Sequence, residues 1–314
     1  MSDAAKKKKK RKSQAPVALV YFATMLLFLV VFGLIASFLV ERITSFDEPE
    51  PVETVTYAPS YTTIYARLSN KGTLMDIALV RIAPEKEQII VTPVSPFTVS
   101  EKDGATFREV LKDGGIRNLQ KAVDSTFGIT TDYYISVSNS TFENIADILG
   151  GIVYTPPEEL YYLNKDSDGN DIAYPAGEAV SIAGHQIRLI CQYPVFSEGM
   201  GGNMKFLGEV LFQFVNNAFQ QSNITKNTLD NMFNTLTSNS DTNYNSNDFK
   251  QHKTYLVQML SKPSAPAVKL VPEGTWTDGE HFTVSAEFKS QLAKAYRDTE
   301  PGDGSTAEES SSQP

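Results

Sequence analysis

The longest apolar run of the chain spans residues 17–40, where 24 consecutive positions carry no charged side chain. At a rise of about 1.5 Å per residue, a helix of that length crosses the roughly 30 Å hydrocarbon core of a bilayer. A cleaved signal peptide has a shorter apolar region followed by small residues, whereas Glu41 and Arg42 follow here. The run therefore predicts one uncleaved transmembrane helix.

From residue 73 onward, short apolar runs alternate with amphipathic segments. Apolar or alternating runs favour strands at residues 74–82, 88–92, 133–137, 152–154 and 187–193. A turn at residues 84–87 joins the first two strands as a hairpin. Apolar spacings of three and four favour helices at residues 116–127, 141–149 and 210–219. Ser140 is the expected cap of the second helix. Residues 222–249 favour a polar helix followed by a loop. Strands that alternate with helices indicate a layered α/β domain.

Charge is distributed unevenly along the chain. The first 16 residues carry seven cations and one anion, so the chain's formal charge of −9 leaves −15 for the remainder. A basic cluster next to a membrane helix marks the cytoplasmic side, and an acidic domain repels polyanions. We therefore expect the main domain outside the cytoplasm and no nucleic-acid partner.

These patterns predict five regions. They are a basic cytoplasmic tail (1–16), a transmembrane helix (17–40), an acidic, proline-containing extracytoplasmic stalk (41–62), the α/β domain (63–298) and a disordered tail (299–314). The single cysteine excludes an intrachain disulfide. Secreted eukaryotic domains commonly carry disulfides, so we expect a bacterial cell-membrane protein.

Few side chains suggest catalysis directly. His185, His252 and His281 have no Cys or His neighbour at zinc-ligand spacing, and Cys191 lies in an apolar run typical of a buried structural thiol. Asp76 differs, because it stands inside an otherwise apolar strand. A buried carboxylate is costly unless it is hydrogen-bonded, paired or bound to a cation. A structural and a functional role for Asp76 both stay open.

The order of segments from residue 73 to 220 resembles the LytR-CpsA-Psr family of cell-envelope proteins. The resemblance rests on Thr73 to Pro84, Gly114-Gly115-Ile116, Phe127 to Tyr134, Ala146 to Ile152 and Gly184 to Ile187. It implies a three-layer α/β/α sandwich with a mixed central sheet and an apolar tunnel for a prenyl tail. It also implies transfer of a glycopolymer from a polyprenyl-pyrophosphate lipid to peptidoglycan or protein. In that reaction arginines hold the pyrophosphate and aspartates bind Mg²⁺.

The positions that match the family's charged motifs carry other residues here. They are Pro96, Phe97, Gln192, Pro194, Met200, Asn203 and Phe206. Residues 86–100 and 189–204 contain no arginine. Asp76 is the surviving candidate for a Mg²⁺ ligand. The candidate phosphate-binding residues are Arg108, Arg188 and Lys205.

We favour a catalytically degenerate member of the family. It would act in cell-wall assembly by binding a polyprenyl-linked lipid, a wall polymer or a partner protein. Two alternatives stay open. One is a divergent, Mg²⁺-dependent glycopolymer transferase, and the other is an envelope scaffold or regulator that binds no lipid.

Overall fold

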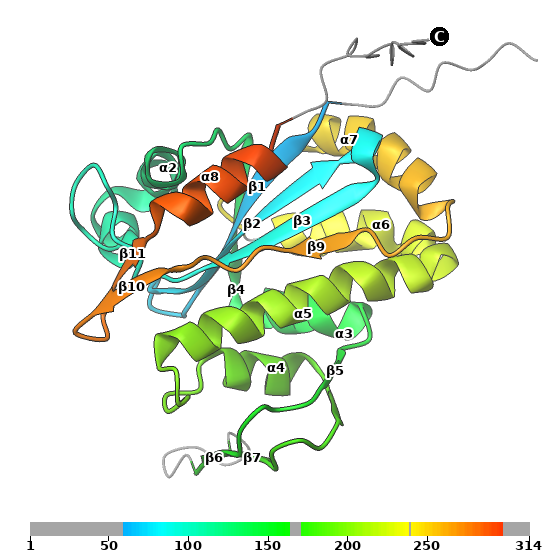
Figure 1. Cartoon of the computed structure of the whole chain (residues 1–314). Helices are drawn as coiled ribbons and strands as arrows, with labels where there is room; N and C mark the ends of the chain where they lie inside the picture. Colours follow the sequence, from blue (N-terminus) through cyan, green and yellow to red (C-terminus); the bar gives the residue numbers. More distant parts are fainter. Residues whose placement is uncertain (1–58, 164–170, 239, 298–314) are drawn as a thin grey trace, which may run out of the picture. The chain divides into compact units, whose positions relative to one another are not determined.

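The computed structural model describes residues 59–163, 171–238 and 240–297 (Figure 1). The chain divides into two units, Met1–Thr56 and Tyr57–Pro314, and the described residues belong to the second. The predicted tail at residues 1–16, the transmembrane helix at 17–40 and the C-terminal tail at 299–314 lie outside them. Within the described ranges, no helix is both long and apolar enough to span a bilayer.

A five-stranded sheet forms the centre of the domain, in the order β4-β1-β2-β3-β9 (Figure 1). Its strands are β1 (Tyr61–Leu68), β2 (Leu74–Ala83), β3 (Gln88–Val94), β4 (Tyr133–Ser138) and β9 (Ala267–Lys269). Neighbouring pairs β1–β2 and β2–β3 are antiparallel, whereas β1–β4 and β3–β9 are parallel. The sheet is therefore mixed, and the predicted β2–β3 hairpin is confirmed, with a short 3₁₀ turn at Pro84–Lys86.

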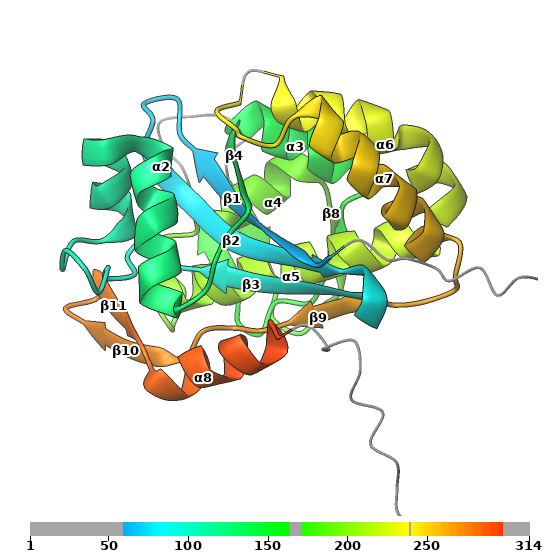
Figure 2. The same cartoon turned by 90° about the horizontal axis from the view of Figure 1, so that it is seen from above.

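Helices cover both faces of this sheet, as Figures 1 and 2 show. Helices α2 (Phe107–Phe127) and α8 (Ala286–Ala295) lie on one face. The other face is covered by α3 (Asn139–Ile148), α4 (Gly184–Cys191), α5 (Met200–Gln220), α6 (Ser222–Thr237) and α7 (Ser246–Leu260). This arrangement confirms the predicted layered α/β fold with a mixed central sheet.

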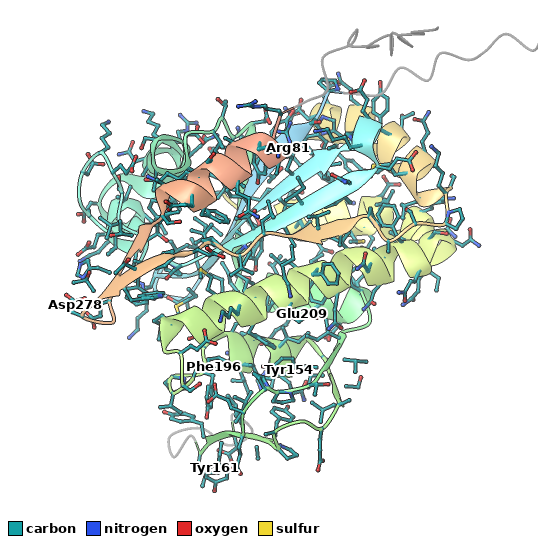
Figure 3. All side chains as sticks on the ribbon, in the orientation of Figure 1. Arg81, Tyr154, Tyr161, Phe196, Glu209 and Asp278 are labelled. Atoms are coloured by element: carbon teal, nitrogen blue, oxygen red, sulfur yellow. The ribbon has the colours of Figure 1, made fainter. Side chains whose placement is uncertain are left out.

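Three two-stranded sheets, of which the second and third are hairpins, complete the described domain. They pair β5 (Ile152–Tyr154) with β8 (Val180–Ile182), β6 (Leu160–Tyr162) with β7 (Ile172–Tyr174), and β10 (Gly274–Thr277) with β11 (His281–Val284). The β6–β7 hairpin carries Tyr161 and lies below α4 and α5 in the view of Figure 3.

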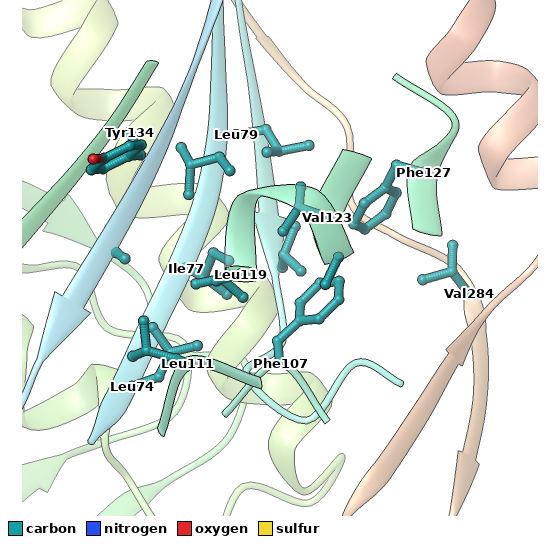
Figure 4. Packing of buried hydrophobic residues seen from close by; sticks show 14 of the residues in the cluster. Leu74, Ile77, Leu79, Phe107, Leu111, Leu119, Val123, Phe127, Tyr134 and Val284 are labelled. Atoms are coloured by element: carbon teal, nitrogen blue, oxygen red, sulfur yellow. The ribbon is translucent and has the colours of Figure 1, made fainter. Parts of the chain in front are cut away.

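The face that carries α2 and α8 is densely packed. Leu74, Ile77 and Leu79 of β2 meet Leu119 and other apolar residues of α2 in a core from which solvent is excluded (Figure 4). Ile77 and Leu79 are two positions apart and therefore point to the same face, as the pleat requires.

Helices α2 and α3 both begin earlier than predicted. The helix expected at residue 116 starts at Phe107, where the Thr106 hydroxyl and the Glu109 carboxylate form a reciprocal capping box. Gly115, with φ of 70°, interrupts it, which is why only the second half shows one regular apolar stripe. Helix α3 is capped by Ser138 rather than Ser140, since the Ser138 hydroxyl accepts the Thr141 amide.

Other boundaries also differ from the prediction. The strand predicted at residues 187–193 is wrong: these residues belong largely to α4, because Ile187, Ile190 and Cys191 are buried at helical spacing. Helix α5 begins ten residues before residue 210, and α7 occupies part of the expected loop. Strand β1 was not predicted, and it begins two residues before the expected domain boundary at 63.

Candidate functional site

An apolar cavity of about 330 Å³ lies between the sheet and the helices α3, α5, α6 and α7. Alternate side chains of β1 (Tyr61, Thr63 and Tyr65) and of β2 (Val80 and Ile82) form its floor. Within the described part of the chain, aliphatic and aromatic side chains line it, with two threonines and no charged residue. We call this space the apolar cavity.

A smaller pocket of about 170 Å³ lies at the N-terminal end of β2. Five segments that are distant in sequence meet there: the start of β2, the loop after β3, the first turn of α2, the end of α4 and the first turns of α5. They contribute the side chains of Asp76, Ser95, Pro96, Phe97, Arg108, Cys191, Gln192, Met200 and Asn203, together with four apolar residues. We call this space the polar pocket.

The two spaces are neighbours along α5 and along the sheet. Leu207 lines the polar pocket and Leu211 lines the apolar cavity, one helical turn or about 6 Å further along the helix. Arg67 of β1 is the cross-strand partner of Asp76. It follows Tyr65 by two positions and therefore points to the same face of the sheet.

Arg67 and Asp76 form a buried ion pair at this junction. The Arg67 Nε donates to the Asp76 Oδ2 at 2.5 Å, and Nη2 contacts the same oxygen. Nη1 donates to the Asn139 Oδ1 at 2.5 Å. The guanidinium carbon also lies 5.4 Å from the centroid of the Phe142 ring, which lines the apolar cavity.

Burial and charge act in opposite directions on this pair. Burial raises the pKa of Asp76, and the charges of Arg67 and then Arg108 oppose that rise. Burial acts to lower the pKa of Arg67, but the Asp76 carboxylate holds it above its ordinary value. Arg67 has no exposed surface. The pair therefore satisfies the carboxylate that the sequence left unexplained.

The model of the LytR_cpsA_psr family matches residues 95–297, which is more than half of the chain. The chain belongs to the LytR-CpsA-Psr family. The match ends well after the region of resemblance, residues 73–220, and includes every helix from α2 to α8, but it begins after residues 73–94, which contain β2 and Asp76. No curated protein matches the chain.

Several solved structures share the fold of this family member. A proposed transcription regulator from Eubacterium siraeum has a TM-score of 0.67 at 19% identity, covering 75% of this chain and 90% of its own. TagV from B. subtilis has a TM-score of 0.60 at 14% identity, covering 76% and 96%. TagT bound to LIIa-WTA has a TM-score of 0.56 at 14% identity, covering 76% and 89%.

In this member of the LytR-CpsA-Psr family, Arg108 is the one predicted phosphate-binding residue that the polar pocket contains. Its Nε donates to the Leu74 carbonyl at 3.1 Å, and its guanidinium carbon lies 4.2 Å from the centroid of the Phe97 ring. Burial lowers the pKa of Arg108, while Glu280 and Asp76 oppose that shift. Among the described residues that line the pocket, Arg108 is the sole cation.

The other two candidates lie elsewhere. Arg188 on α4 forms an ion pair with Glu143 of α3 through its Nε. Lys205 on α5 pairs with Glu198 at 2.5 Å and lines a separate surface hollow that includes Tyr154, Phe196 and Glu209, near the β5 side of α5 (Figure 3). Neither side chain lines the polar pocket.

Two of the degenerate positions also fall outside the polar pocket. Pro194 is exposed in the loop after α4. Phe206 packs edge-on against Tyr154, with ring centroids 4.8 Å apart. Neither Phe206 nor Phe97 lines the apolar cavity, so these two rings do not fill it.

The residues present do not fit a Mg²⁺ site. Magnesium prefers near-octahedral oxygen coordination, commonly with one or two carboxylates. Asp76 supplies the one carboxylate among the described residues lining the polar pocket, and its Oδ2 is bound by Arg67. In the described ranges, no group of three or more His, Cys, Asp or Glu residues could hold a metal ion.

Cys191 is buried, as predicted, and burial raises the pKa of its thiol well above the usual range. A neutral thiol is a poor nucleophile at neutral pH. Arg67 is the residue that sequence reasoning missed, because β1 itself was not predicted. Asp76 in an apolar strand was the signal that could have revealed Arg67, because a buried carboxylate requires a partner and a neighbouring strand can supply it.

Proposed function

We propose that this chain is a single-pass, membrane-anchored protein with its main domain outside the cytoplasm. It acts in the assembly of bacterial cell-wall polymers by binding a polyprenyl-linked lipid, and it does not transfer the polymer. The observation that supports lipid binding most strongly is the apolar cavity. The membrane anchor rests on the sequence of residues 17–40.

A cavity whose lining, among the residues that the structure describes, is apolar and uncharged suits a hydrocarbon chain. Each buried methylene contributes about 0.8 kcal/mol to transfer from water. Flat aromatic and branched side chains such as Phe142, Phe214 and Phe233 provide the walls. Family membership supports a prenyl chain as the ligand, and the related TagT has been solved bound to LIIa-WTA and to LI-WTA.

The polar pocket supports binding without turnover. A pyrophosphate carries two or more negative charges, and transition-state stabilisation at phosphates depends on arginine, lysine or metal charges. Here one guanidinium, that of Arg108, faces the pocket, while the charge of Arg67 is offset by Asp76. Pro96, Phe97 and Met200 add no hydrogen-bond donor from their side chains.

The test uses the full-length chain in lipid nanodiscs. We expect polyprenyl phosphate to raise its melting temperature and no transfer of a polymer from a polyprenyl-pyrophosphate donor with Mg²⁺ present. Ala218→Trp, which places a large ring in the apolar cavity, should abolish the thermal shift. Val153→Trp is the matched control, because Val153 is 59% exposed and lies outside the cavity.

Other outcomes would identify the alternatives. Turnover that Asp76→Ala abolishes would show a divergent transferase. No thermal shift and no turnover, together with a protein partner crosslinked in cells, would indicate a scaffold or regulator.

A further inference from the structure

We infer that the guanidinium of Arg67 takes the place of a divalent cation at Asp76, so that this site is complete without metal. The inference goes beyond the proposed function, because it concerns the ion requirement of the polar pocket. It holds whether or not a lipid occupies the apolar cavity.

The geometry first shows that Arg67 is aimed at the carboxylate by the sheet itself. Arg67 and Asp76 are directly opposite each other on the antiparallel strands β1 and β2, where side chains on one face lie within about 5 Å at Cβ. Two guanidinium nitrogens contact the same carboxylate oxygen. No change in backbone position is needed for the pair to form.

The guanidinium is also fixed from its other sides. Its Nη1 donates to Asn139 at the start of α3, and its guanidinium carbon lies 5.4 Å from the centroid of the Phe142 ring, about one turn later in the same helix. Three elements therefore hold Arg67: β1, β2 and α3. A side chain held this firmly has little freedom to withdraw and admit an ion.

Charge and ligand supply then argue against a metal ion at Asp76. A divalent cation on the Asp76 carboxylate would stand within a few ångströms of the buried guanidinium, and like charges repel strongly where water is excluded. The remaining oxygen ligands from side chains of the described pocket residues are neutral ones, on Ser95, Gln192 and Asn203. Arginine instead provides a permanent positive charge with fixed donor directions.

The decisive variant is Arg67→Asp, which would place two carboxylates opposite each other on β1 and β2. The probe is Mn²⁺ alone, titrated into the full-length chain and followed by electron paramagnetic resonance and by thermal melting. We expect the wild type to show no saturable Mn²⁺ site in the pocket and no change in melting temperature with Mn²⁺ or a chelator.

We expect Arg67→Asp to melt at a lower temperature than wild type, to bind Mn²⁺ saturably and to recover part of the lost temperature when Mn²⁺ is added. Arg67→Gln is the matched control, because it also breaks the ion pair but adds no carboxylate. It should melt lower and gain nothing from Mn²⁺. The double variant Arg67→Asp with Asp76→Asn should lose the Mn²⁺ site.

Two results would overturn the inference. One is saturable Mn²⁺ binding by the wild type that Asp76→Asn removes, a comparison that needs no destabilised variant and stays informative if Arg67→Asp does not fold. The other is a folded Arg67→Asp that binds no Mn²⁺. Lipid binding is measured separately in chelator, so a missing thermal shift with polyprenyl phosphate would count against the proposed function alone.

Discussion

The two faces of one sheet differ in how they are filled. Ile77 and Leu79 of β2 point to the face covered by α2 and α8, where packing leaves them no exposed surface. Val80 and Ile82 of the same strand point the other way and border the apolar cavity. Both sets are apolar, so the difference arises from the helices that cover each face and not from the strand.

The ion pair of Arg67 and Asp76 lies on the face of the sheet that borders the apolar cavity, which we call the hollow face. Asp76 is two positions before Ala78, which packs in the core cluster on the side of α3, α4 and α5, and Arg67 meets it across the strand pair. One face of the sheet thus serves stability, while the other combines a void with a buried charge pair. The features on which the proposed function rests therefore lie on the face where packing is incomplete.

Of the substitutions that test this difference between the faces, those in the ion pair should lower the free energy of unfolding most. Arg67→Met leaves the Asp76 carboxylate buried without its partner, and such a loss costs about 3–5 kcal/mol. The double variant Arg67→Met with Asp76→Leu removes both charges and should cost clearly less than either single change. Denaturant unfolding of all three variants measures this. A single change costing under about 1 kcal/mol would show that the pair contributes little.

The same substitution, Leu→Ala, should cost different amounts of unfolding free energy on the two faces of the sheet. Leu119→Ala on α2 creates a new cavity in the dense core, where Leu119 has no exposed surface, and should cost about 2–5 kcal/mol. Leu211→Ala on α5 enlarges a cavity that already exists, so we expect about 1–2 kcal/mol, close to the transfer free energy alone. Equal costs in denaturant unfolding would mean that the hollow face is as well packed as the dense one.

A smaller effect concerns the start of α2 on the dense face. Thr106→Ala removes the hydroxyl that accepts the Glu109 amide and donates to the Glu109 carboxylate, and leaves the backbone half of the capping box in place. It should lower the free energy of unfolding by about 1 kcal/mol. Thr106→Ser keeps the hydroxyl and is the control, which should recover most of the loss. Chemical denaturation of the two variants provides the measurement, and equal destabilisation of both would argue against a capping role.

These contrasts also explain what the sequence could predict. The β2–β3 hairpin, β4, α3 and the second half of α2 follow from local periodicity and turn residues. The convergence of Phe97, Arg108, Gln192 and Asn203 in one pocket followed only from the resemblance, because no local pattern brings a loop, two helix starts and a helix end together. Strand β1 was not predicted, because three residues of its inner face (Tyr61, Thr63 and Tyr65) line the cavity and the fourth is Arg67, so that this face is too polar to suggest a buried strand.

The smallest expected effect is on how the stability of the domain changes with pH, to which one histidine on each side of the sheet contributes. On the hollow face, the His252 ring stacks on Tyr61 with centroids 3.8 Å apart, and Tyr244 lies within hydrogen-bond distance of its Nδ1 at 3.1 Å. Burial lowers the pKa of His252, while Asp248 and Asp132 oppose that shift. On the other side of the domain, a hydrogen bond to Asp278 raises the pKa of His281, whose side chain is partly exposed.

These two histidines should therefore contribute slopes of opposite sign. Because the folded state binds a proton at His252 less readily than the unfolded chain, its contribution is full above the unfolded pKa of about 6.5 and is lost as pH falls through the folded value. The stabilisation from His281 is full below the unfolded pKa and is lost as pH rises through its raised folded-state pKa. Melting temperatures between about pH 5 and 8 should show that His252→Gln reduces the acid-side loss. His281→Gln should make that loss steeper, and parallel profiles for both variants would contradict the burial of His252 beside the cavity.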